Sequence, residues 1–125
     1  MLSAFLVEDS PTIRENLVPT LEELADVTVI AVAETESEAV EWLHTHGDEA
    51  DLVILDLFLK QGSGLGVLTS GQLNTRCSIV VLTNYATSDI RQRCEALGAD
   101  AVFDKSSELD AFLEFCRGQP VHDES

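Results

Sequence analysis

Basic residues are scarce in this chain of 125 residues. Seven lysines and arginines stand against 23 aspartates and glutamates, which gives a formal net charge of −16 at pH 7. Such a surface repels nucleic acid phosphates and anionic lipids, so we expect neither direct nucleic-acid binding nor membrane attachment. Part of the acidity is expected to serve solubility alone, because six glutamates occupy positions typical of solvated helices and loops: Glu22, Glu23, Glu34, Glu36, Glu38 and Glu41.

Cysteine is also rare, with only Cys77, Cys94 and Cys116, and no pair has the spacing of a metal site or a CxxC motif. The odd number and wide spacing favour a reducing, cytoplasmic location. The first ten residues, "MLSAFLVEDS", lack a basic lead and carry two acids, so they predict neither a signal peptide nor a membrane anchor.

No low-complexity run interrupts the chain, and 45% of its residues are hydrophobic. These features are typical of one compact globular domain of ordinary size. We expect that domain to cover residues 1–118, with residues 119–125 as a flexible tail.

Short apolar runs recur about every 25 residues and are rich in Val, Ile, Leu and Phe: "AFLV", "VTVIAV", "LVIL", "SIVVL" and "AVF". They alternate little, as is typical of strands buried on both faces of a parallel sheet. Segments with a helical period separate them. Strict alternation of strand and helix predicts a right-handed, parallel, three-layer α/β domain.

Helix signals support this arrangement. Ser10 and Pro11 form a cap and first-turn pair before an apolar stripe, and "TESE" at 35–38 is a capping box. A glycine-rich stretch predicts only a short, weak helix at 64–70. The first helix is expected to bury one apolar stripe, formed by Ile13, Leu17, Leu21 and Leu24. Cys94 and Cys116 are expected in the core, and Trp42 is expected to pack against it. His44 and His46 are expected at a helix end.

Polar side chains follow four of the five apolar runs, where the carboxyl ends of parallel strands meet and ligands bind. They are Glu8, Asp9, Asp56, Thr83, Asp104 and Lys105. Carboxylates about 4 Å apart repel by roughly 4 kcal/mol at an effective dielectric constant near 20. Mg²⁺ would offset this repulsion through oxygen ligands, and Lys105 could pair with Asp56 or with a phosphoryl oxygen. The set is that of a phosphoryl-transfer site with Asp56 as nucleophile, although Asp56 as a loop cap and Lys105 as a surface lysine is the simpler alternative.

The ordered set resembles the receiver domain of two-component response regulators, over about residues 4–117. The matching pieces are "ED" at 8–9, "LVILDL" with Asp56, Gly64, "VVLT" with Thr83, and "ALGADAVFDKS" with Lys105. The resemblance implies a doubly wound, five-stranded parallel sheet with strand order 2-1-3-4-5, the flavodoxin-like receiver fold. It also implies a stand-alone signalling domain rather than an enzyme acting on other substrates.

The resemblance further implies roles for individual residues. Asp56 accepts a phosphoryl group from a histidine kinase, a phosphotransfer protein or a small donor, and Mg²⁺ is held by Glu8, Asp9, Asp56 and the carbonyl of Phe58. Thr83 and Lys105 bind the phosphoryl oxygens, and Phe103 is the aromatic residue that turns inward when Thr83 moves. Phe58 and Tyr85 occupy positions that tune the phosphoryl lifetime, and the surface of the fourth helix, fifth strand and fifth helix faces a downstream protein.

Several positions depart from the family pattern. Ser106 replaces the usual proline after the lysine, and a cis bond there costs about 3 kcal/mol without proline, so we do not count on one. Leu59 and Lys60 replace a common Met-Pro pair, which favours a mobile loop with an added positive charge. Asn84 replaces a small residue and could narrow access to the acceptor.

Two other functions fit parts of the same pattern. A phosphatase with an aspartyl nucleophile typically needs a second acid two residues after it, where this chain has Phe58. A receiver-like interaction module that works without phosphorylation fits the missing proline and the unusual loop. Arg91 and Arg93, among the few basic groups, are expected on a solvated helix face, with an acidic partner as the alternative.

Overall fold

A computed structural model describes residues 2–71 and 77–120. Within them the chain forms one parallel sheet with strand order β2-β1-β3-β4-β5, which confirms the predicted order. The strands are β1 (Leu2–Val7), β2 (Val27–Ala33), β3 (Leu52–Leu55), β4 (Ser78–Thr83) and β5 (Ala101–Asp104). Each short apolar run of the sequence is therefore a strand, as expected for a sheet buried on both faces.

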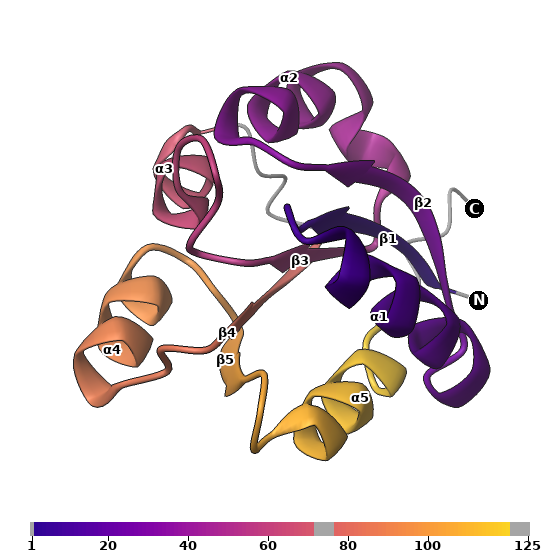
Figure 1. The fold of residues 1–125 in the computed structure, drawn as a ribbon. Helices are drawn as coiled ribbons and strands as arrows, with labels where there is room; N and C mark the ends of the chain where they lie inside the picture. The colour runs from indigo at the N-terminus through magenta and orange to yellow at the C-terminus, as the bar shows by residue number, and fades with distance from the viewer. Residues whose placement is uncertain (1, 72–76, 121–125) are drawn as a thin grey trace.

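In the described part of the chain each strand is followed by one α-helix: α1 (Pro11–Leu24), α2 (Glu36–His46), α3 (Gly64–Thr69), α4 (Ser88–Ala96) and α5 (Leu109–Arg117). A short 3₁₀ turn, Gly47–Glu49, follows α2. Figure 1 shows α1 and α5 on one face of the sheet and α2, α3 and α4 on the other. Two separate apolar cores result, one between the sheet and each helical layer.

Local signals set the helix ends where the sequence predicts them. The hydroxyl of Ser10 accepts a hydrogen bond from the Ile13 amide at 3.3 Å, and Pro11 follows as the first helical residue. Thr35 caps α2 in the same way, through the Glu38 amide at 3.2 Å. Gly98, with φ of +109°, follows the end of α4, a backbone conformation that glycine adopts without a steric penalty.

Most of the predicted packing positions are buried. Trp42 is half-buried and stacks on Phe5 with ring centroids 4.1 Å apart, and Cys94 and Cys116 lie fully within the cores. Burial raises the pKa of the Cys116 thiol to about 12, because it disfavours the thiolate. The first stripe ends early, however: Leu17 and Leu21 are buried, whereas Leu24 is 54% exposed at the end of α1.

Two features bound the fold. Among residues 2–71 and 77–120, no helix has the length and apolar character needed to cross a bilayer. Most of the tail predicted at 119–125 lies outside the described residues, which end at residue 120.

Candidate functional site

The parallel ladder extends one residue past the ends of the central strands. The amide of Asp56 donates to the carbonyl of Val7 at 2.9 Å, and the amide of Glu8 donates to the carbonyl of Ala33 at 3.0 Å. These bonds hold the loops after β1 and β3 against each other. The buried carboxyl groups of Glu8 and Asp56 therefore meet at one edge of the sheet.

Lys105 supplies the countercharge between these two acids. Its Nζ lies 2.6 Å from Oε1 of Glu8 and 3.1 Å from Oδ2 of Asp56. The lysine side chain is 11% exposed, so the three groups form a nearly dry ionic cluster. In such surroundings the ion pairs offset part of the high cost of desolvating each charge.

Burial and pairing act in opposite directions on these groups. Burial raises the pKa of Glu8, and the nearby charge of Asp56 adds to the rise, while the hydrogen bond from Lys105 lowers it in part. For Lys105, burial is the largest single effect and lowers the pKa. The bond to Glu8 and the charges of Asp56 and Glu8 together outweigh burial, so the pKa of Lys105 is raised.

Asp9 completes a carboxylate set suited to a hard cation. One oxygen from each of Glu8, Asp9 and Asp56 lies within 4.8 Å of the others. Mg²⁺ prefers oxygen ligands and is usually bound through one or two carboxylates with several retained waters. The donor set therefore fits Mg²⁺, and Lys105 is the group that offsets the same negative charge within the protein.

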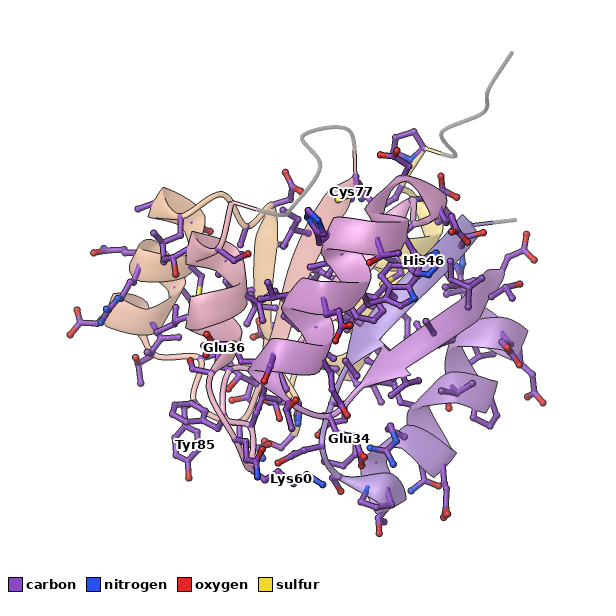
Figure 2. The ribbon with its side chains drawn as sticks, turned by 90° about the horizontal axis from the view of Figure 1, so that it is seen from above. Glu34, Glu36, His46, Lys60, Cys77 and Tyr85 are labelled. Atoms are coloured by element: carbon purple, nitrogen blue, oxygen red, sulfur yellow. The ribbon has the colours of Figure 1, made fainter. Side chains whose placement is uncertain are left out.

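A pocket of about 190 Å³ opens above this cluster and brings most of the predicted site residues together. Its lining comprises Glu8, Asp9, Ser10, Ile13, Asp56, Phe58, Asn84, Tyr85 and Lys105. The rings of Phe58 and Tyr85 meet edge to face at the rim, with centroids 4.8 Å apart, and each residue is more than half exposed. Figure 2 shows Tyr85 at the same end of the molecule as Lys60 and Glu34.

Thr83 is fully buried at the end of β4 and does not line the pocket. Its carbonyl accepts a hydrogen bond from the Lys105 amide at 2.9 Å. Its hydroxyl accepts one from the Tyr85 amide at 3.3 Å. The threonine thus links the loop that carries the lysine to the loop that carries the rim aromatic.

The side chain of Phe103 does not face Thr83 in this structure. Phe103 packs against Phe112 and Phe115 in the core beneath α1 and α5, with ring centroids 6.2 and 5.8 Å apart. Successive strand residues face opposite sides of a sheet, and the register pairs Phe103 with Leu82 rather than with Thr83. The ring therefore lies on the other face from the Thr83 side chain, and the buried neighbour Val102 is the residue of β5 that points to the same core as α4.

The loop after β5 has no cis peptide; none occurs among the described residues. Asp104 organises this loop instead, because its Oδ1 accepts hydrogen bonds from the amides of Ser106 and Ser107 and from the Ser106 hydroxyl. The same bonds, led by the one from the Ser106 hydroxyl, lower the pKa of Asp104. A serine thus shapes the turn where the family commonly has proline.

Arg14 takes part in the site, although the sequence pattern did not single it out. Its guanidinium donates to the carbonyl of Glu8 at 2.8 Å and to Oε2 of Glu34 at 2.8 Å. Lys60 lies 3.9 Å from the other oxygen of Glu34. Glu34 is therefore paired with basic groups rather than simply solvated. Lys60 points to Glu34 and also adds positive charge near the site.

Glu36 is also more than a solvated residue. Its Oε1 accepts a hydrogen bond from the Ser63 amide at 2.9 Å, and its own amide donates to the carbonyl of Gln61 at 3.1 Å. These two bonds tie the start of α2 to the loop between β3 and α3, the loop for which the sequence favours mobility. Gly64 is required there, because a Cβ would lie 2.3 Å from the carbonyl oxygen of Asp56.

Arg91 is not on a plain solvated face either. From α4 it donates to the carbonyls of Ala86 at 2.9 Å and Val102 at 2.7 Å, and it pairs with Glu108 at 2.5 Å. Glu108 in turn accepts from the Asp104 amide at 2.9 Å. One side chain therefore connects the loop after β4, strand β5 and the loop after β5, a long-range set of bonds that helical periodicity does not reveal.

Comparison with known proteins places this site in a family. The model described as "Response regulator receiver domain" matches residues 4–117. A protein-glutamate methylesterase/protein-glutamine glutaminase from Nitrosospira multiformis is 29% identical over 104 residues. That match covers 82% of this chain but only 28% of the relative, so this chain spans under a third of that protein's length.

Solved structures share the fold. The response regulator domain of Thermotoga maritima CheB aligns with a TM-score of 0.82 at 18% identity, covering 95% of this chain and 96% of that one. A Burkholderia pseudomallei response regulator with a phosphorylated aspartic acid and a calcium ion aligns with a TM-score of 0.75 at 22% identity, covering 90% of this chain and 65% of that one. With the family match spanning nearly all of the sequence, this chain belongs to the response regulator receiver domain family of two-component signalling.

Proposed function

We propose that this protein is a Mg²⁺-dependent phosphoacceptor switch in which Asp56 carries the phosphoryl group. The observation that carries the proposal is the buried cluster of Lys105, Glu8 and Asp56, with Asp9 beside it, at the base of an open pocket. A phosphorylated aspartic acid in the Burkholderia pseudomallei relative supports the same chemistry.

In the reaction, a carboxylate oxygen of Asp56 attacks the phosphorus of a phosphorylated histidine on a kinase or phosphotransfer protein. The new O–P bond forms as the P–N bond breaks, and the electron pair of that bond stays on the histidine nitrogen. Lys105, already 3.1 Å from Asp56, offers its ammonium to the transferred oxygens. Glu8, Asp9, Asp56 and the Phe58 carbonyl would hold Mg²⁺, which supplies charge neutralisation of those oxygens when bound.

The rim aromatics would set how long the phosphoryl group lasts. Phe58 and Tyr85 stand in contact at the mouth of the pocket, so both rings would hinder a water molecule that approaches phosphorus from that side. Asn84 lines the same pocket and narrows the remaining access. We expect slow loss of the phosphoryl group as a result.

The signal would leave the site through Thr83 and Arg91. In this structure the Thr83 hydroxyl accepts a hydrogen bond from the Tyr85 amide. A phosphoryl oxygen on Asp56 would give the same hydroxyl a new acceptor. Movement of this loop carries Ala86, whose carbonyl is bonded to Arg91, and Arg91 is bonded to Glu108 before α5. The contacts therefore support the α4, β5 and α5 surface as the face that changes for a downstream protein.

The test is intact mass after incubation with phosphoramidate, with and without Mg²⁺, on the native chain and on Asp56→Asn. The proposal requires a single phosphoryl adduct that depends on Mg²⁺ and is absent from the variant. No adduct on the native chain would favour an interaction module that works without phosphorylation. An aspartyl phosphatase is not supported, since Phe58 stands where that chemistry needs a second acid.

A further inference from the structure

Strand β2 is an outer strand of the sheet and pairs only with β1 among the described strands. Its seven residues, "VTVIAVA", include no charged residue and no proline. Natural sheets usually protect such an edge with lysine, proline or a covering segment, because its backbone N–H and C=O groups can pair with another chain. The edge of β2 has the character of a strand-pairing surface.

A bulge interrupts the regular pairing of β2 with β1. The register with β1 moves from Val29 to Ala31, which leaves Ile30 as the extra residue. Ala31 packs against the core beneath α2, whereas Ile30 and Val32 are members of neither apolar core. Both remain exposed, at 39% and 43%.

A groove of about 410 Å³ lies between β2 and α2. We call it the β2–α2 groove, and its residues are Val32, Ala33, Glu38, Glu41, Trp42, Thr45 and His46. The five α2 residues recur at the three- and four-residue spacing of one helix face. The small side chain of Ala33 opposite them leaves the space open, and Figure 2 shows His46 on α2 beside β2.

Trp42 gives this groove a rigid aromatic wall. Its ring is stacked on Phe5 with an angle of 16° between the planes. The ring of His46 lies 5.7 Å away on the same helix, and Glu49 holds His46 through a 2.7 Å contact to Nδ1. An aromatic ring fixed on both sides binds a partner with little loss of side-chain entropy.

The groove carries negative charge. Glu38 and Glu41 line it, and no lysine or arginine is among its lining residues. A cation beside two carboxylates gains from the negative charge of both. A lysine or arginine side chain is therefore the complementary occupant.

A second copy of this chain does not fit these requirements. Each copy has a formal charge of −16, and its own β2 would bring no basic side chain to the groove. Pairing two such edges would also place the glutamates of both copies near one another, and like charges in an interface cost free energy.

We propose that the β2 edge and the β2–α2 groove together bind an extended segment of a partner protein in which basic and apolar residues alternate. The segment's backbone pairs with β2, its basic side chains enter the groove beside Trp42, and its apolar side chains cover the exposed Ile30. This surface is separate from the Asp56 pocket, so the proposal holds whether or not Asp56 is phosphorylated.

The test uses a blocked peptide of alternating lysine and valine, about seven residues long to match β2. Trp42 is the single tryptophan of the chain, so its fluorescence reports directly on the groove. We expect a saturable change in that fluorescence. Glu41→Lys should weaken binding by at least about tenfold, which corresponds to roughly 1.4 kcal/mol.

Two controls separate this site from general attraction between opposite charges. Glu95→Lys makes the same charge change at an exposed position on α4 and should leave binding nearly unchanged. The same peptide with alternate backbone nitrogens methylated should bind far more weakly, because it cannot pair with β2. No fluorescence change, equal loss in both protein variants, or equal binding of the methylated peptide would each overturn the proposal.

Discussion

The ammonium of Lys105 lies closer to Glu8 than to Asp56: Nζ is 2.6 Å from Oε1 of Glu8 and 3.1 Å from Oδ2 of Asp56. In this structure Lys105 therefore pairs with the buried Glu8 as well as with Asp56, the proposed phosphoryl acceptor. A phosphoryl group on Asp56 and a cation on the carboxylates would both compete for these contacts. The cluster is held together by charges that the proposed reaction rearranges.

Lys105→Met should destabilise the protein in EDTA by roughly 3 kcal/mol, because it leaves buried carboxylates without their countercharge. Mg²⁺ should then raise the melting temperature more in the variant than in the native chain, since the cation replaces the lost positive charge. Thermal unfolding with EDTA and with saturating Mg²⁺ measures both effects. An equal Mg²⁺ shift in the two proteins would contradict the shared role of lysine and cation.

Arg14→Met should weaken Mg²⁺ binding by about tenfold, the lower end of the effect of residues that orient metal ligands. The guanidinium holds the carbonyl of Glu8, so its loss frees the turn that carries Glu8 and Asp9. The measurement is the Mg²⁺ dependence of the melting temperature. Arg93→Met removes the same charge from an exposed position on α4 and should leave the affinity unchanged.

Tyr85→Ala and Phe58→Ala should each shorten the phosphoryl lifetime by about tenfold, equivalent to about 1.4 kcal/mol in the barrier to hydrolysis. Each change opens the rim at which the two rings now meet. The decay of the phosphorylated species, followed by intact mass after the donor is removed, gives the rate. Tyr85→Phe keeps the ring and should decay like the native protein; unchanged decay in both alanine variants would exclude the rings as a barrier.

Glu108→Gln should flatten the loss of stability on acidification. The hydrogen bond from Arg91 is the main cause of the lowered pKa of Glu108. A lowered folded-state pKa contributes stability above the ordinary value of 4.5, and this contribution disappears as pH falls through the folded-state value. Melting temperatures from neutral pH to below pH 4.5 measure the difference, and an identical acid profile for the variant would show that the pair contributes nothing.

The strands and the carboxylate site could be predicted because both depend on where apolar runs end, whereas the strand order followed from the family resemblance. Asp56 and Lys105 follow their strands directly, and parallel strands bring such residues to one edge. The switch role of Phe103 came from the family resemblance alone, and the register of β5 places its ring on the other face from the Thr83 side chain. The bonds of Arg91 could not be read from the sequence, since its periodicity on α4 does not reveal which distant carbonyls accept its hydrogen bonds.

Gly66 provides a test in which two physical effects oppose each other. Replacing a glycine inside a helix with alanine normally stabilises the helix by about 1 kcal/mol. In this protein a Cβ at Gly66 would lie 2.3 Å from Oε1 of Glu36, the atom that accepts the Ser63 amide. The carboxylate must move, and losing that hydrogen bond costs about 1 kcal/mol.

The single substitution Gly66→Ala should therefore bring no gain in stability, whereas the same change in a Glu36→Ala background should bring the full gain of about 1 kcal/mol. Urea unfolding of the native chain, both single variants and the double variant gives the coupling energy. We expect a coupling of about 1 kcal/mol, because the two residues compete for one space. Additive effects would mean that Glu36 is not held over Gly66 in solution, and the tie between α2 and the loop after Asp56 would then have to be abandoned.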